Sequence, residues 1–240
     1  MKVLVLLTVY KRNRLEEQLQ SIYNQTLKPD YLVVFQNENH INIEPLKEKY
    51  NFIHIKNDYN TKFFGRFAHC ISYPVDICCV LDDDIIPGKL CIESFVNQCI
   101  KTNGIMGGNA RIGTKNKNHK MLVKNIAGLD GRNSNLFLVD FVGHLWCFKK
   151  EWLYHMFSIP PLTFDTGEDM HLCFSSKVKG NINSYLAKQH DNSRCDITSN
   201  KYADDQHSSF KITSRQDRID VEEYFINKYG LKMISTTNPL

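Results

Sequence analysis

Short apolar runs alternate with helical patterns through the first hundred residues. The runs predict four strands, at residues 3–9, 31–35, 52–55 and 77–81. Between them, apolar residues recur at the spacing of one helical face, as Leu15, Leu19 and Ile22 do. Repeated strand, helix, strand units form a mostly parallel sheet with helices on both faces. The first half therefore predicts an α/β fold with a Rossmann-like, mostly parallel central sheet flanked by helices.

The second half has a different pattern. We expect a strand at residues 105–108, a polar and basic loop at 111–120, and a strand at 137–147 that bends at Gly143. A helix is predicted from near Thr166, a last strand at 182–186, and a closing helix around Val221 and Phe225. These elements predict a small mixed sheet beside the parallel one.

The length of 240 residues suits one domain. Within it we expect a first half at 1–104, a second half at 105–188, and a mobile C-terminal segment with the closing helix at 189–240. An apolar content of 42% and a charged content of 23% are typical of a globular chain. The net charge of +4 is too small to indicate a nucleic-acid partner.

The distribution of apolar residues and cysteines bears on the compartment. The first ten residues are apolar but lead into Lys11 and Arg12, which predicts a core strand and no signal peptide. No run approaches the ~20 apolar residues that span a bilayer. The eight cysteines contain no CxxC pair and lie mostly in apolar stretches, where a thiol packs as a small hydrophobe. We therefore predict a cytoplasmic protein without a transmembrane segment.

Three consecutive aspartates, Asp82, Asp83 and Asp84, follow the strand predicted at 77–81. Neighbouring carboxylates repel one another unless a cation lies between them, and a divalent metal that carries a phosphate ester is a common one. Asp82 and Asp84 lie on the same side of an extended chain, so both can face one ligand. The alternative is a solvated acidic turn, because aspartate is a common turn residue.

Two further segments carry candidate charged groups. Arg66 lies in the segment 60–67, at the start of a helix before the aspartate strand, where its forked donors can reach a diphosphate. The alternative is a surface cation. Glu168 and Asp169 follow Thr166 and Gly167, and a carboxylate at a helix start is held rigidly enough to act as a general base. The alternative is a capping box between Thr166 and Asp169, which only satisfies the helix end.

The segment 140–146 combines a glycine with aromatic residues. A bend at Gly143 would bring His144 and Trp146 to a cleft, where the indole can support a sugar ring. The alternative is that Trp146 belongs to the core.

Taken in order, four segments resemble the GT-A class of nucleotide-sugar-dependent glycosyltransferases: TVYKRNRLEEQLQSIYNQT, NTKFFGRFAHCISYPVDICCVLDDDIIPG, VDFVGHLWCF and TGEDMHLCF. The stretch with Asn60, Arg66 and the aspartates is similar to the exostosin-like branch. GEDMHL is similar to the EDxxL element of the large family 2. The resemblance covers residues 3–190, and it implies that the half at 1–104 binds the nucleotide sugar and that the half at 105–188 lies on the acceptor side. Two features depart from family 2: Gln36, Asn37 and Glu38 stand where an aspartate often meets uracil, and no RW pair follows the ED element.

The resemblance implies a role for each matching residue. Donor-binding residues would be Thr8, Tyr10, Arg12, Asn37, Glu38, Asn60, Arg66, Asp82 and Asp83. The metal, Mn²⁺ or Mg²⁺, would be held by Asp84 and His190. Asp169 and Glu168 would be catalytic, and Gly143, His144 and Trp146 would bind the acceptor.

The predicted activity is metal-dependent transfer of a sugar from a nucleoside diphosphate sugar, of which a UDP-sugar is the expected form, to the hydroxyl of a glycan, protein or small molecule. A nucleotidyltransferase on a related fold is one alternative, although the glycine-rich phosphate loop typical of that class is missing after the first strand. A non-catalytic carbohydrate-binding relative is another.

Overall fold

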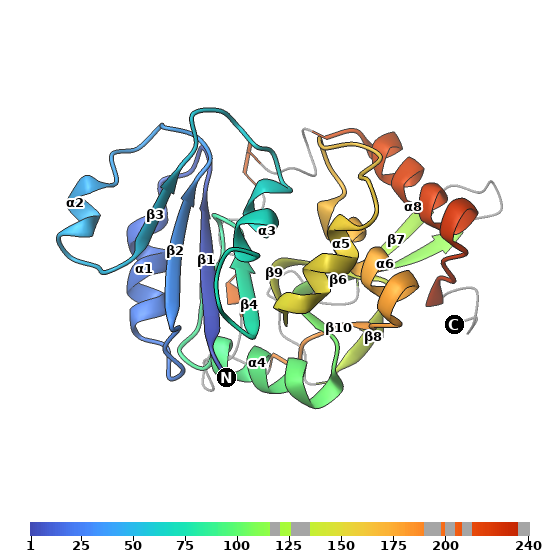
Figure 1. The fold of residues 1–240 in the computed structure, drawn as a ribbon, viewed down its shortest axis with the longest axis horizontal. Helices are drawn as coiled ribbons and strands as arrows, with labels where there is room; N and C mark the ends of the chain where they lie inside the picture. The colour runs from blue at the N-terminus through green and yellow to red at the C-terminus, as the bar shows by residue number, and fades with distance from the viewer. Residues whose placement is uncertain (116–120, 126–134, 190–197, 200–204, 208–212, 235–240) are drawn as a thin grey trace.

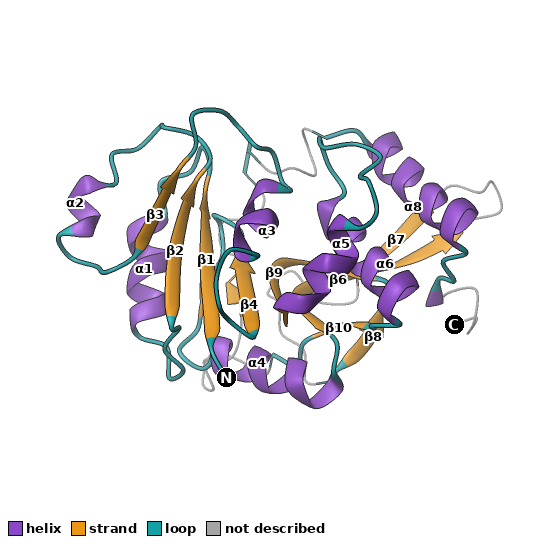
Figure 2. Cartoon of the chain, viewed as in Figure 1, coloured by secondary structure: helices purple, strands orange, loops and turns teal. Residues whose placement is uncertain are grey.

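One twisted sheet runs through the whole molecule (Figure 1). The computed structural model describes residues 1–115, 121–125, 135–189, 198–199, 205–207 and 213–234. In this part of the chain the strand order is β3-β2-β1-β4-β9-β6-β10-β8, and β7 also pairs with β6. Helices flank the sheet, so the α/β prediction is confirmed (Figure 2).

The first half of the sheet is parallel. Its strands are β1 (Val3–Val9), β2 (Tyr31–Gln36), β3 (Ile53–Lys56) and β4 (Ile77–Leu81). The connecting helices are α1 (Leu15–Tyr23), α2 (Glu44–Lys47) and α3 (Gly65–Cys70). Every residue of β1 and β4 is buried, which explains why both are continuous apolar runs. Because these strands are parallel, the chain leaves β1, β2 and β4 at the same edge.

The second half of the sheet is mixed. Strand β9 (Phe141–Lys149) is antiparallel to both β4 and β6 (Ile105–Lys115). The remaining strands are β7 (Met121–Asn125), β8 (Phe137–Val139) and β10 (Ser184–Leu186), and a separate pair joins β5 (Ile86–Pro87) to β11 (Thr198–Ser199). The expected mixed strands of the second half are therefore present, and β9 joins them to the parallel strands in one sheet.

Two local expectations for the second half were wrong. Residues 111–115 do not begin a loop but continue β6, where they pair with β7. The break between β8 and β9 falls at Asp140, not at Gly143. The Asp140 carboxylate accepts hydrogen bonds from the backbone N–H of Gly113 at 2.8 Å and of Ile234 at 2.9 Å, which hold the chain at that point.

The helices of the second half pack on one another and on β9. They are α4 (Cys91–Thr102), a 3-10 turn (Lys150–Trp152), α5 (Leu153–Phe157), α6 (Glu168–Gly180) and α8 (Arg215–Tyr229). Phe225 of α8 lies 5.6 Å from Phe174 of α6, ring centre to ring centre. Arg218, in the first turn of α8, donates to Thr166 at 3.2 Å, which places the start of α8 beside the start of α6, where the glutamate and aspartate of the GEDMHL segment lie.

Two properties of the described chain concern its cysteines and its helices. The seven cysteines that it contains are free and buried. None of its helices combines the length and the apolar character required to cross a membrane.

Candidate functional site

A cavity of about 550 Å³ opens at the edge where β1, β2 and β4 end. The opposite wall comes from β6, β9 and the starts of α6 and α8. Fourteen of the predicted site residues line it: Thr8, Tyr10, Arg12, Asn37, Asn60, Arg66, Asp82, Asp83, Asp84, Gly143, His144, Trp146, Glu168 and Asp169. Glu38 does not line it, and His190 lies outside the described residues.

Arg66 joins the two walls of the cavity. Its Nη1 donates to Oδ1 of Asp82 and its Nη2 donates to Oε1 of Glu168 at 2.8 Å. Its side chain is only 5% exposed, so this is a buried ion triad. Both Nη groups are therefore used inside the protein, which differs from the expectation that they reach a diphosphate.

Trp146 lies beneath this triad. The guanidinium of Arg66 lies 4.6 Å from the centre of the indole ring, and the indole N–H donates to the backbone oxygen of Val142 at 2.8 Å. Trp146 is 2% exposed. The ring therefore supports Arg66, and the burial agrees with the alternative that this tryptophan belongs to the core.

Arg12 holds the other two aspartates. Its Nη1 donates to Asp83 at 2.5 Å, and its Nη2 lies 3.5 Å from a carboxylate oxygen of Asp84. The same guanidinium forms a forked pair with Asp205, with both distances 2.7 Å. This hydrogen bonding lowers the pKa of Asp205 to about 2. Sequence reasoning missed Asp205, because it lies in a polar segment with no motif.

Burial makes the aspartate cluster costly to ionise. Desolvation raises the pKa of Asp83 to about 7, against the opposing effect of Arg12, and it also raises the pKa of Asp84. Oδ2 of Asp83 and Oδ1 of Asp84 are buried and meet no hydrogen-bond donor in the described chain. Two buried carboxylate oxygens on neighbouring residues therefore lack a hydrogen-bond donor in the described chain.

These oxygens fit a hard divalent cation. Mg²⁺ in nucleotide sites uses one or two protein carboxylates together with substrate phosphates. Within the described ranges, no group of three His, Cys, Asp or Glu side chains is arranged as a complete metal cage. Asp83 and Asp84 are the described residues that could hold such a cation.

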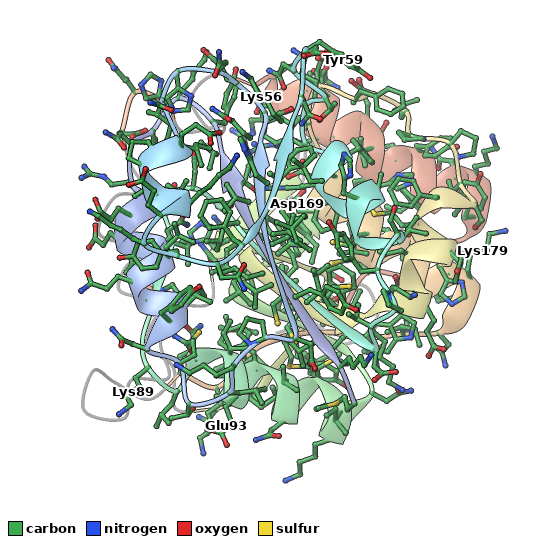
Figure 3. The ribbon with its side chains drawn as sticks, turned by 60° about the vertical axis from the view of Figure 1, so that its left-hand side comes forward. Lys56, Tyr59, Lys89, Glu93, Asp169 and Lys179 are labelled. Atoms are coloured by element: carbon green, nitrogen blue, oxygen red, sulfur yellow. The ribbon has the colours of Figure 1, made fainter. Side chains whose placement is uncertain are left out.

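Glu168 and Asp169 start α6 and face the cavity (Asp169 is labelled in Figure 3, in the middle of the molecule). Burial raises the pKa of Glu168 to about 7 and also raises that of Asp169. The capping box of Thr166 and Asp169 does not form: the residue before the helix is Gly167, with φ 79°, and no side chain caps it. Asp169 accepts instead from the N–H of Met170 at 2.7 Å.

The start of β9 is tied to the aspartate turn. The backbone oxygen of His144 accepts a hydrogen bond from the N–H of Asp82 at 3.0 Å. The backbone φ of His144 is 69°, which is unusual for a residue other than glycine. Its Nε2 lies 3.2 Å from Nδ2 of Asn109. The positive φ therefore falls at His144, within β9, and not at Gly143.

The end of β2 forms a polar network. Nδ2 of Asn37 donates to Oδ1 of Asn60 at 2.7 Å, and Oδ1 of Asn37 accepts from the N–H of Thr61 at 2.9 Å. These contacts connect the end of β2 to the loop before Arg66. Both asparagines keep their place in the cavity wall through this network.

Arg111 and Arg218 also line the cavity, and sequence reasoning missed both as site residues. Arg111 fell in a segment expected to be a loop. Arg218 lies in the first turn of α8, where only the apolar residues of the closing helix carried a signal.

The fold, an α/β sheet flanked by helices with a cavity at its carboxyl edge, is similar to that of a solved structure. TarS of S. aureus, a glycosyltransferase of solved structure, matches 78% of this chain with a TM-score of 0.53 and 14% sequence identity. This chain spans 37% of the TarS chain. No family model matches the sequence. No curated protein matches it either.

Proposed function

We propose that this chain is a metal-dependent glycosyltransferase that moves a sugar from a UDP-sugar to a hydroxyl acceptor. The observation that carries the proposal is the cavity of about 550 Å³, with three successive aspartates on one wall and the pair Glu168 and Asp169 on the other. This volume is in the range of small-molecule sites, about 300–1,000 Å³. The glycosyltransferase-like fold supports the same class of reaction.

The donor would bind at the ends of β1, β2 and β4. Thr8, Tyr10, Asn37 and Asn60 supply neutral polar and aromatic groups on this wall, which suit a base and a ribose. Asp82 is the most exposed of the three aspartate side chains, at 27%. We assign Asp82 to the donor for this reason.

Mn²⁺ or Mg²⁺ would be held by Asp84, with Asp83 beside it. The cation would neutralise the charge that develops on the departing diphosphate. Arg12 supplies a fixed positive charge next to both aspartates, at 2.5 Å from Asp83. His190 stays a predicted additional ligand.

Asp169 would accept the proton of the acceptor hydroxyl. Its place in the first turn of α6 holds the carboxylate rigidly, and its raised pKa makes it a better base than an ordinary aspartate. Glu168 is fixed by Arg66 at 2.8 Å and would position this end of the helix.

The test measures UDP release from a panel of UDP-sugars, with Mn²⁺ present or chelated. We expect turnover that requires the metal and that falls by about 10²–10³-fold in Asp84→Ala and in Asp169→Asn. Asp76→Asn is the matched control, because Asp76 lies outside the cavity and is 63% exposed. Full metal-dependent turnover in both cavity variants would overturn the proposal, and release of pyrophosphate would identify a nucleotidyltransferase.

A further inference from the structure

Lys62 lines the cavity, and the proposed mechanism gives it no role. Among the described residues, the lysine and arginine side chains that line the cavity are Arg12, Lys62, Arg66, Arg111 and Arg218. Carboxylates hold Arg12 and Arg66 in largely buried pairs. Arg111 and Arg218 come from β6 and α8, in the opposite wall. On the donor side, at the ends of β1, β2 and β4, Lys62 is thus the described cation whose partner is not a buried carboxylate.

The backbone of Lys62 is fixed beside the end of β2. Its N–H donates to Oδ1 of Asn60 at 2.8 Å, and its carbonyl oxygen accepts from Nδ2 of Asn37 at 3.2 Å. Its φ of 55° lies in the left-handed region, which is unfavourable for a residue other than glycine and persists where surrounding contacts impose it. Both asparagines line the cavity and are predicted donor-binding residues. The backbone therefore starts the Lys62 side chain at the place where the donor would bind.

The side chain of Lys62 is held much less firmly than its backbone. Its Nζ lies 3.4 Å from Oδ1 of Asp165, and the two side chains are 50% and 69% exposed. Across the part of the chain that the structure describes, no hydrogen bond uses this ammonium group. Water screens an ion pair as exposed as this one, so the pair contributes little to stability. Lys62 can therefore exchange Asp165 for another anion at little cost.

Arg66 cannot make the same exchange cheaply. Its side chain is 5% exposed, and it holds both Asp82 and Glu168. Turning Arg66 toward a ligand would leave these carboxylates buried without their cation, which is strongly destabilising. Lys62 has no such obligation. A lysine also suits a phosphate, because its flexible stem carries a compact charge with three donors.

The segments that carry Lys62 and Asp165 have a second contact, which does not involve charge. Lys62 lies between β3 and α3, and Asp165 lies between α5 and α6 (Figure 1). The ring centres of Phe64 and Phe164, from the same two segments, lie 5.4 Å apart. This aromatic contact can keep the two segments together when the lysine turns to a ligand. The exchange therefore requires movement of one side chain and not separation of the cavity walls.

We infer that Lys62 exchanges Asp165 for the diphosphate of the bound nucleotide, whose oxygens its ammonium group then holds. The inference rests on the proposed function for the identity of the diphosphate as part of a sugar donor. The contact itself rests on Lys62, Asp165 and the cavity. A diphosphate brings negative charge to a wall that already carries three aspartates, so a cation besides the metal offsets part of the repulsion.

The first experiment measures binding without any turnover. Isothermal titration calorimetry with Mg²⁺ present compares inorganic pyrophosphate, UDP and uridine on the wild type, Lys62→Gln and Lys49→Gln. We expect Lys62→Gln to weaken the binding of pyrophosphate and UDP about tenfold, the effect of losing a charge-assisted hydrogen bond, and to leave uridine unaffected. Lys49→Gln is the matched control, because Lys49 also forms an exposed ion pair but lies outside the cavity. It should bind all three probes as the wild type does.

Two further variants test the exchange itself. Asp165→Asn frees the ammonium group and should tighten pyrophosphate binding about two- to threefold. This variant also removes a negative charge from the cavity, so it is repeated in the Lys62→Gln background, where it should have no effect if Asp165 acts through Lys62. Equal tightening in both backgrounds would contradict the exchange. Lys62→Arg keeps the charge and should bind pyrophosphate nearly as the wild type does.

The outcomes separate this inference from the proposed function. The inference is overturned if the wild type does not bind pyrophosphate, or if Lys62→Gln binds it as the wild type does. Metal-dependent sugar transfer together with unchanged UDP affinity in Lys62→Gln would leave the proposed function standing and remove the role of Lys62. If no UDP-sugar is turned over but pyrophosphate binding depends on Lys62, the proposed function fails and the diphosphate contact stands.

Discussion

The two walls of the cavity handle charge in opposite ways. On the wall at the ends of the parallel strands, each of the three aspartates has an arginine beside it, and two buried carboxylate oxygens still lack a donor in the described chain. On the wall made by β6, α6 and α8, the guanidinium of Arg111 donates to the neutral oxygens of Asn109 and Ala110. Carboxylates therefore hold Arg12 and Arg66, whereas neutral oxygens hold Arg111. A metal ion would complement the two carboxylate oxygens that lack a donor.

The largest expected effect comes from removing Arg66, which bridges the walls. Arg66→Met would leave Asp82 and Glu168 without their shared cation, and we expect the free energy of unfolding to fall by about 3–5 kcal/mol. Urea denaturation measures this loss. The double variant Arg66→Met, Glu168→Gln should recover part of the stability, because it removes one of the stranded charges. A loss of less than ~1 kcal/mol in the single variant would contradict the description of Arg66 as a buried cation that bridges Asp82 and Glu168.

The next largest effect is expected on the pH dependence of the free energy of unfolding, through Glu168. Burial raises its pKa to about 7 from an ordinary value of 4.5. The folded state therefore favours the protonated form, and this contribution is complete below pH 4.5 and disappears as the pH rises through about 7. The free energy of unfolding of the wild type should fall between pH 5 and 8 by up to about 3 kcal/mol because of Glu168. We expect Glu168→Gln to remove this part of the fall.

The measurement is urea denaturation of both proteins at several pH values. Glutamine keeps the oxygen that accepts from Arg66, so packing is little changed. A variant whose pH dependence matches that of the wild type would show that Arg66 keeps Glu168 ionised in the folded protein.

A smaller effect is expected at the aspartate wall when Arg12 is replaced. Arg12→Gln removes a positive charge that lies 2.5 Å from Asp83, so Mn²⁺ without nucleotide should bind about tenfold more tightly. Titration calorimetry measures the affinity. Lys62→Gln is the control: Lys62 lines the same cavity but pairs with Asp165 at 3.4 Å, so its loss should change Mn²⁺ affinity little. Weaker Mn²⁺ binding in Arg12→Gln would mean that Arg12 organises the aspartates and does not compete with the cation.

The smallest effect is expected at the surface, where an ion pair has nearly the same length as the buried one. Lys49 lies 2.9 Å from Glu16, compared with 2.8 Å between Arg66 and Glu168, but its side chain is 61% exposed. Lys49→Met should lower the free energy of unfolding by less than ~1 kcal/mol. A loss as large as that of Arg66→Met would show that burial does not determine the strength of these pairs.

Sequence reasoning worked where the signal was local. Strands β1 and β4 begin and end as predicted, because each is a continuous apolar run that the sheet buries on both faces. Most of the expected site residues line one cavity, because parallel strands end at a common edge of the sheet. The extent of β6 was underestimated, since Ile112 is the only large apolar residue in 111–115 and the segment is placed by its pairing with β7.

The partners of individual charges could not be predicted in the same way. Arg66 is separated from Glu168 by 102 residues, and Arg12 from Asp205 by 193. No spacing rule connects residues so far apart, because the contact depends on how the two halves of the sheet meet. Sequence reasoning therefore did not predict that Arg66 bonds to Asp82 and Glu168, and its role toward a ligand stays a prediction.

Strand β9 has a mechanical consequence. It pairs with β4 on one side and with β6 on the other, so hydrogen-bonded strands run under both walls of the cavity, with one shift of register between Gly107 and Asn109. Two ligands bound against these walls would share one floor, so their separation would be set when the chain folds. Opening and closing of the cavity would then depend on movement of α8, and not on rotation of one half of the molecule against the other.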